Sequence, residues 1–326
     1  MNLPFDWPQG PSDSFAFVLN PFHYGGNLPI ELMPGCHLGK ANSEQLTMIK
    51  GVQEKLGRVG RSMAFDREPI PKGLRESPHW DRKLRPRTTF WVINFRTAER
   101  DVSEFRQASQ LTDNEIAIGA LFPPKEQVHM PNVEYPWIIE SFFDRDWHND
   151  AQPLNVADLE KARQLVHAIR SFRQEEKDDR AKQLVVRVFD DFVSLSNDHR
   201  IGHLQLLGHF GLIEALLTHN PAASSPRLSH QIRTKVPLLM RRFHRSLLPS
   251  DFFAINDSQQ VWALLYRLRS CYAHGEKPDF EKTGRDGGIK ELSDLERVYC
   301  FVRESLKRLL ILAIEEPQLV FDLKAC

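Results

Sequence analysis

The period at which apolar residues recur changes once along this chain, close to Asn155, and that change constrains the fold more than any other feature of the sequence. After Asn155, apolar side chains return every three or four residues, the spacing that places them on one face of an α-helix. Helices are predicted over residues 156–175, 181–195, 201–218, 228–243, 258–272 and 292–315. Helices with one apolar face bury it against one another, so residues 156–326 are expected to form an all-α bundle.

The first part of the chain follows a different pattern, in which short stretches rich in Phe, Ile, Val and Trp alternate with proline-containing breaks. This pattern predicts strands at residues 14–19, 88–95, 115–122 and 136–143, and a helix at 43–56. Five of the six tryptophans also lie before residue 155. The fold class is therefore predicted to be α+β, with a mixed or β-rich domain in residues 1–155 and a helical domain in residues 156–326.

Charge and cysteine content narrow the classes of protein to which the chain belongs. Lys and Arg together number 43, as do Asp and Glu, so the chain lacks the overall positive charge that would by itself indicate a nucleic-acid-binding protein. The four cysteines form no C-x-x-C pair, which favours a reduced, intracellular protein without a zinc site. No apolar run reaches the roughly 20 residues of a membrane span, and no signal peptide is recognisable. A cytoplasmic protein is expected.

The helix predicted at residues 258–272 ends in a group of polar residues that suggests phosphate chemistry. Arg269 is permanently charged, His274 supplies an imidazole that can accept or donate a proton, and Gly275 is a typical helix stop. On an ideal helix the two side chains are about 140° and 7.5 Å apart, so they converge only if His274 lies in a fraying last turn. A second interpretation stays open, in which the pair only caps the helix and complements its dipole.

The sequence Arg269-Ser-x-x-x-His274-Gly, led in by Leu-Tyr, resembles the R-x(4–6)-H signature of the HEPN superfamily, and is most similar to its ApeA-like branch. Residues 206–217, which contain Glu-Ala-Leu-Leu, and residues 228–240 resemble the preceding helices of that family in the same order. The resemblance covers the second half of the chain. It implies a metal-independent endoribonuclease without a cofactor, of the kind found in toxins and antiphage (abortive infection) effectors.

The resemblance also implies roles for individual residues. His274 would act as general base or acid, and Arg269 would hold the phosphate and stabilise its developing charge. Ser270, polar in the position after the arginine as in many family members, would contact phosphate or orient a partner. Apart from the resemblance, Glu214 lies on a mostly apolar helix, where it could pair with Arg269 or equally face solvent. A homodimer or larger even oligomer is implied, because one Arg and one His are few groups for the reaction. The cleavage would use the RNA 2′-OH and leave 2′,3′-cyclic phosphate and 5′-OH ends.

Two further features of the second half bear on partners. The segment around residues 228–245 is the most basic of the chain, and it offers arginines that could bind the RNA backbone: Arg233, Arg241, Arg242 and Arg245. Some HEPN toxins carry a Tyr two residues after the His, which a nucleotidyltransferase modifies. This chain has Glu276 there, so silencing by that route is not expected.

Three functions are compatible with these observations. The leading hypothesis is an endoribonuclease effector whose N-terminal domain senses a phage-derived or protein trigger. The alternative is a catalytically silent HEPN module that binds RNA, nucleotide or a protein partner. A nucleotide-binding accessory in which Arg269 only holds phosphate finds no support from a Walker or G-x-G-x-x-G motif.

Two polar segments of the first half could be functional sites, but in both cases a purely structural role is the favoured interpretation. The run Arg82, Lys83, Arg85 and Arg87 precedes aromatic residues, as in a platform for single-stranded nucleic acid, but a solvated loop before a core strand is favoured. Residues 144–150 contain three Asp and a His, yet a polar interdomain loop is favoured over a metal site.

Overall fold

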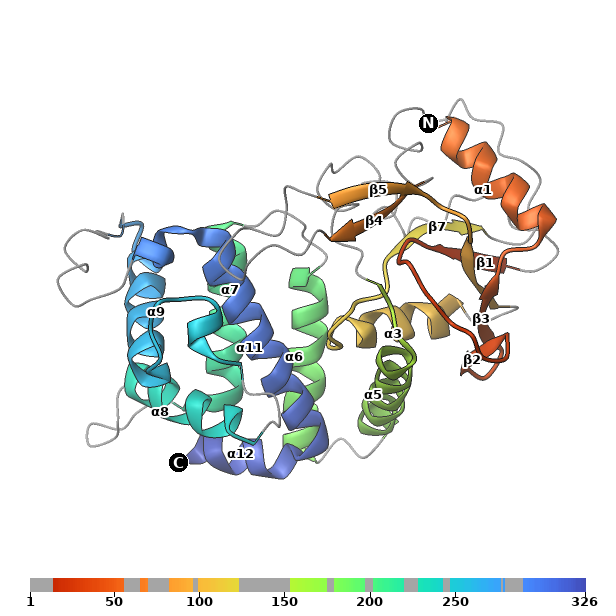
Figure 1. Cartoon of the computed structure of the whole chain (residues 1–326). Coiled ribbons are helices and arrows are strands. Elements are labelled where there is room, and N and C mark those ends of the chain that lie inside the picture. Colours follow the sequence, from red (N-terminus) through yellow and green to blue (C-terminus); the bar gives the residue numbers. More distant parts are fainter. Residues whose placement is uncertain are drawn as a thin grey trace, which may run out of the picture. The chain divides into compact units, whose positions relative to one another are not determined.

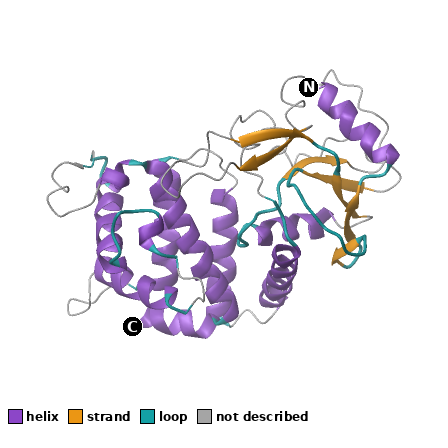
Figure 2. Cartoon of the chain, viewed as in Figure 1, coloured by secondary structure: helices purple, strands orange, loops and turns teal. Residues whose placement is uncertain are grey.

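Strands occupy the first part of the chain and helices the second, as Figure 2 shows. The structure, a computed structural model, describes residues 14–55, 65–69, 82–95, 99–122, 153–174, 179–196, 202–219, 228–242, 247–276, 278 and 290–326. An antiparallel sheet with short helices precedes an all-helical region, which confirms the predicted α+β class. The chain forms two compact units, Met1–Val166 and His167–Cys326. The predicted domain boundary after residue 155 stays a prediction.

The first unit is built on a five-stranded sheet in which every neighbouring pair is antiparallel, in the order β2-β3-β6-β1-β7. Three of its strands lie where the sequence predicted them, and the order along the chain is β1 (Ser14–Val18), β2 (Ile30–Met33), β3 (Cys36–Lys40), β6 (Trp91–Phe95) and β7 (Ile118–Phe122). A separate two-stranded sheet pairs β4 (Phe65–Pro69) with β5 (Arg82–Pro86). The sheet and its helices are drawn in Figure 1.

Both faces of strand β1, which lies between β6 and β7, are covered. Phe15 and Phe17 point to one face and pack with the buried Met48 and Ile49 of helix α1 (Ser43–Lys55). The ring of Phe15 stacks on that of Phe122 with centroids 4.3 Å apart. Residues of β1 that alternate with these are buried too, and helix α3 (Glu99–Ser109) packs against β2 and β6. Burial on both faces explains why β1 reads as a continuous apolar run.

Arg87 is a core residue of this unit. Its side chain is buried and donates hydrogen bonds to the carbonyl oxygens of Val18, at 3.0 Å, and Leu19, at 2.6 Å. The guanidinium also lies over the Phe17 ring, 5.3 Å from its centroid. The predicted solvated loop is therefore wrong for Arg87, and a role for it in stacking nucleic acid is equally excluded. The rest of the basic run lies in strand β5 rather than in a loop.

All six helices predicted after Asn155 are present. The helices of this part are α5 (Val156–Gln174), α6 (Arg180–Ser196), α7 (His203–Leu217), α8 (Leu228–Met240), α9 (Ser258–Ala273), α11 (Leu295–Glu315) and α12 (Pro317–Ala325). Two short 3-10 helices, η3 (Pro249–Asp251) and η5 (Lys290–Ser293), precede α9 and α11. Helix α7 contacts α6, α8, α9, α11 and α12, so it is the centre of the bundle (Figure 1). Its sequence is apolar on nearly all sides, as expected of a helix surrounded by others.

Hydrogen bonds at the ends of helices show why the boundaries were predictable. Asn155 accepts a hydrogen bond from the Asp158 N–H at 2.9 Å, and Asp158 accepts one from the Asn155 N–H at 3.2 Å. This reciprocal arrangement is a capping box that starts α5.

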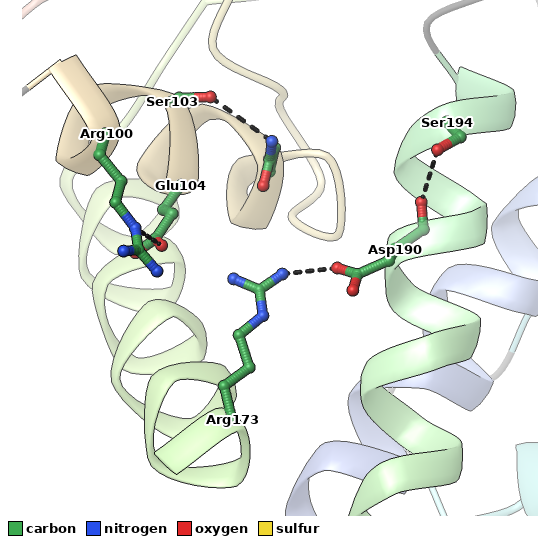
Figure 3. A network of polar contacts seen from close by, with 7 residues as sticks. Arg100, Ser103, Glu104, Arg173, Asp190 and Ser194 are labelled. Carbon is green, nitrogen blue, oxygen red and sulfur yellow. Dashed lines mark hydrogen bonds and ion pairs between the residues drawn. The ribbon is translucent and has the colours of Figure 1, made fainter.

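Figure 3 shows two ion pairs of the helices. Arg173 of α5 pairs with Asp190 of α6 at 2.5 Å, and within α3 Arg100 pairs with Glu104 at 2.9 Å.

Glycines of α7 have different surroundings. The glycines of this segment predict from the sequence that another helix approaches closely. A Cβ on Gly208 would lie 2.8 Å from Leu195 of α6, so this glycine permits the predicted close contact. A Cβ on Gly211 would meet nothing within 4 Å, so the same expectation is wrong there. Gly202 is the N-cap of α7.

Other sequence-based expectations differ from the structure. The helix predicted at 292–315, with Pro317 as its stop, does end at Glu315, but it is not the last helix. Pro317 begins α12, because proline is well tolerated in the first turn of a helix. Helix α3 was not predicted, since its apolar positions are few: Val102, Phe105 and Ala108. The strand predicted at residues 136–143 and the polar segment 144–150 lie outside the described residues.

Candidate active site at helices α7 and α9

Helix α9 carries the Arg-x-x-x-x-His motif, and both of its ends are defined by caps. The Asp257 carboxylate accepts a hydrogen bond from the Gln259 N–H at 2.8 Å, which starts the helix. At the other end the N–H of Gly275 donates to the Tyr272 carbonyl, and that of Glu276 donates to the Cys271 carbonyl. Gly275 has φ of +71°, so the end is a Schellman motif and the glycine ends the helix as predicted.

Arg269 is held against α7. Its Nη2 lies 3.0 Å from Oε2 of Glu214, so the expected pair is present. The two side chains are 28% and 16% exposed, which places the ion pair partly below the surface. The guanidinium also lies over the ring of Tyr266, 5.8 Å from its centroid. Since Tyr266 is one turn earlier in α9, the Arg269 side chain extends toward the start of the helix.

The ion pair leaves hydrogen-bonding capacity unused. Within the part of the chain that the structure describes, Nε of Arg269 and Oε1 of Glu214 are both buried without a hydrogen-bond partner. A buried polar atom without a partner is unfavourable by roughly 1–3 kcal/mol. The arrangement would therefore gain from a ligand oxygen or a rearrangement that satisfies Arg269. Among the described residues of the predicted site, Arg269 and Glu214 are the two with a buried polar atom that lacks a hydrogen-bond partner.

Tyr266 adds a phenol to this group. Burial and then the negative charge of Glu214 raise the pKa of Tyr266 above its usual value, while the charge of Arg269 acts in the opposite direction. A hydrogen bond between the side chains of Tyr266 and Glu214 raises the pKa in the same direction, so the hydroxyl is protonated throughout the physiological range.

His274 is exposed and occupies the C-cap of α9. Its backbone N–H donates to the Ser270 carbonyl at 3.1 Å, so the chain is still nearly helical there. The side chains of Arg269 and His274 therefore keep an angular separation of about 140°. No hydrogen bond or ring contact joins them in the described residues, and the Arg269 guanidinium points away from His274. Ser270, which is half-buried, lies between them in sequence.

A histidine that the sequence did not single out lies on the same side of α9 as Arg269. The imidazole of His203, at the start of α7, lies against the ring of Tyr272, with ring centroids 4.1 Å apart and ring planes tilted by 42°. His203 is exposed, whereas Tyr272 is half-buried. Sequence reasoning missed His203 because it is 69 positions before Tyr272 and belongs to no motif.

A second unpredicted histidine, His209, lies in the core of the bundle. It is fully buried, and its Nδ1–H donates to the Gln205 carbonyl at 2.8 Å. Its ring meets those of Phe192 and Tyr299 edge to face. Burial lowers the pKa of His209 from 6.5 to about 4, so the imidazole is neutral at physiological pH. We assign it a packing role.

The arginines proposed to bind RNA are not equivalent. Arg233 on α8 and Arg241, which directly follows this helix, are exposed. Arg233 Nη2 lies 3.3 Å from Nδ1 of His230. Arg242 is bound by the carboxylate of Glu316, so part of its charge is already compensated. Arg245 lies outside the described residues.

Other features limit the kinds of site the chain offers. In the described part of the chain, no three His, Cys, Asp or Glu side chains gather closely enough to hold a metal ion. Among the described helices none combines the length and apolar character needed to cross a bilayer.

Comparison of the chain with models of known protein families, with curated proteins and with solved structures found no match.

Proposed function

We propose that the chain is an endoribonuclease that cleaves RNA through attack of the 2′-OH, without a metal ion or cofactor. The observation that carries the proposal is the half-buried Arg269, held by Glu214 with its Nε unsatisfied, on the helix that ends in the exposed His274. A buried guanidinium of this kind suits a phosphate oxygen, which would fill the unused donor.

RNA supplies its own nucleophile, so the protein has three tasks. An imidazole must take the 2′-OH proton, a cation must stabilise charge on the phosphorane, and an acid must protonate the departing 5′-oxygen. We assign charge stabilisation to Arg269 and proton transfer to His274. Glu214 and Tyr266 would position the guanidinium through the contacts described above, and Ser270 would contact the phosphate.

Arg269 and His274 of one chain lie on different sides of α9, so the proposal includes a composite site. In a homodimer or larger even oligomer, a two-fold axis beside α9 would bring the Arg269 of one protomer toward the His274 of its partner. The exposed Arg233 and Arg241 would bind the flanking backbone, making affinity fall with rising salt. Mixing Arg269→Ala with His274→Ala subunits tests this, because one site of the heterodimer would keep both groups.

The test of the function itself is incubation of the purified full-length protein with total cellular RNA. We expect fragments with 2′,3′-cyclic phosphate and 5′-OH ends. Arg269→Ala and His274→Ala should each abolish cleavage while leaving the melting temperature close to wild type. Arg267→Ala is the matched control, because Arg267 is an exposed arginine of the same helix without an assigned role. Wild-type cleavage by both site variants would overturn the assignment.

We propose further that the activity serves antiviral defence or a toxin system, with the N-terminal unit as sensor of the trigger. Growth arrest on expression, relieved by His274→Ala, would support this role. Normal growth under full expression of an active nuclease would count against it.

The alternative is a catalytically silent module that binds RNA, nucleotide or a protein. The separation of Arg269 from His274 within one chain favours it, because a lone guanidinium binds phosphate but does not transfer protons. One measurement distinguishes the two functions. A silent module would bind labelled RNA in a salt-dependent manner without cleaving it.

A further inference from the structure

We infer that the carboxylate of Glu214 restrains RNA binding, because it neutralises the guanidinium of Arg269 on which the phosphate would bind. The inference rests on the proposed function, or on its silent alternative, since both place an RNA phosphate at Arg269. It deepens that proposal by naming the group that sets the affinity of the site. Glu214 would thus both position the guanidinium and oppose the binding of its ligand.

Two opposite charges are in direct contact at this place. Nη2 of Arg269 lies 3.0 Å from Oε2 of Glu214, and neither side chain is more than 28% exposed. Water and salt therefore screen this pair less than they screen a pair on the surface. A phosphate on the same guanidinium would carry its negative charge to about 6 Å from the carboxylate, where like charges repel.

The carboxylate is held in place rather than free to move away. A hydrogen bond joins the side chains of Glu214 and Tyr266, and the Arg269 guanidinium lies over the Tyr266 ring, 5.8 Å from its centroid. Glu214 belongs to α7, whereas Tyr266 and Arg269 belong to α9, so the packing of these two helices keeps the three side chains together. An arriving phosphate therefore meets a guanidinium whose charge is already compensated.

Among the contacts of the described residues, one hydrogen bond joins Arg269 to Glu214. Nε of Arg269 and Oε1 of Glu214 have no hydrogen-bond partner there, although a two-point contact between the same groups would pair these two atoms with each other. A one-point contact compensates the charge of the guanidinium but binds it less firmly than a two-point contact. A phosphate can therefore overcome the restraint, which lowers affinity without closing the site.

Two roles of Glu214 predict opposite effects on RNA binding. If the carboxylate only orients the guanidinium, its loss weakens binding, because Arg269 then has more conformations to lose. If its charge opposes the phosphate, removal of the charge strengthens binding. Glutamine separates the two effects, because its amide oxygen still accepts a hydrogen bond from Nη2 but carries no charge.

The experiment measures the Kd of a fluorescently labelled single-stranded RNA for the full-length protein at a fixed salt concentration. All variants carry His274→Ala, so that the RNA is bound without being cleaved. Adding Glu214→Gln should lower the Kd about 10-fold, the effect of a like charge about 6 Å away at a partly screened site. The matched control is Glu44→Gln, which removes the same charge from an exposed residue of α1 and should change the Kd by less than about twofold.

The sign of the change decides the inference. If Glu214→Gln binds RNA as its parent does, or more weakly, the inference is wrong, while cleavage by the wild-type protein would leave the ribonuclease standing. An equal gain in Glu44→Gln would reduce the effect to net charge and would also overturn it. If the wild type yields no fragments and His274→Ala retains no RNA, the proposed function fails, and this inference fails with it. If Glu214→Gln lowers the melting temperature, Glu214→Ala replaces it, and binding no tighter than that of the parent would again overturn the inference.

Discussion

Lowering the pH should destabilise the helical unit through His209. The pKa of this buried imidazole is lowered from 6.5 to about 4, chiefly because burial disfavours the charged ring, with Arg303 contributing in the same direction. The unfolded chain, in which the imidazole is solvated, takes up a proton near pH 6.5, and the folded chain only near pH 4. Stability is therefore full above about pH 6.5 and falls as the pH drops through this window.

The magnitude follows from the pKa difference. A difference of about 2.5 corresponds to about 3 kcal/mol at pH values below both pKa values. At pH about 4.5, where the folded state is already partly protonated, the loss is about 2.5 kcal/mol. This is a large part of the stability of a typical domain. His209 should therefore dominate the difference between matched proteins with and without the imidazole.

The assay is urea unfolding followed by circular dichroism of the helices, for wild type and His209→Asn at several pH values. Asparagine can still donate to the Gln205 carbonyl but does not titrate. The variant should be less stable than wild type near neutral pH, because it leaves a cavity between Phe192 and Tyr299. The stability difference should narrow by about 2.5 kcal/mol on going from pH about 7.5 to 4.5.

A matched control is available in the exposed His167 of α5, whose replacement by asparagine should leave the pH dependence unchanged. The reasoning would be refuted by a difference between wild type and His209→Asn that stays constant within about 0.5 kcal/mol over this range. That result would mean that the buried imidazole finds compensation for its charge in the folded state.

Three further predictions concern packing, the N-terminal core and metal dependence. Gly208→Ala should cost about 1–2 kcal/mol in urea unfolding, because its Cβ would press on Leu195. Gly211→Ala, with open space around it, should instead stabilise by up to about 1 kcal/mol, and equal effects would contradict the assigned contacts. Arg87→Met should lower the stability of the first unit by about 2–3 kcal/mol, since two buried carbonyl groups lose their donors; an unchanged unfolding midpoint would show that water replaces them. RNA cleavage should survive excess chelator, and restoration of a lost activity by a divalent ion would direct attention to residues 144–150.

Helix positions followed from the sequence because their causes are local. The alternation of apolar and polar residues, the caps Asn155 and Asp257, and the stop at Gly275 act within one or two turns. Each of these signals was confirmed by its own hydrogen bonds. Strand β1 was likewise predicted from a local signal, its run of apolar residues, and its burial on both faces is a finding of the structure.

For the candidate site, the sequence predicted which residues are present but not how their side chains are oriented. Sequence placed Arg269 and His274 on one helix and suggested Glu214 as a partner. Only the packing of α7 against α9 decided that the guanidinium turns toward Glu214, away from His274, and that His203 stands beside Tyr272. Spacing within a helix fixes angles around its own axis, but it does not reveal which face a neighbouring helix covers.

What the sequence by itself determined is the six longer helices after Asn155, though not α12, and the residue types at the end of α9. Only the tertiary structure decided which aromatic rings the charged and titratable side chains contact. Arg87 lies over the Phe17 ring in the core, His209 lies among aromatic rings, and His203 contacts Tyr272 on the Arg269 side of α9. The physical reason is that local hydrogen bonds and periodicity act over a few residues. Burial and side-chain contacts depend on partners tens of residues away, whose identity no local pattern encodes.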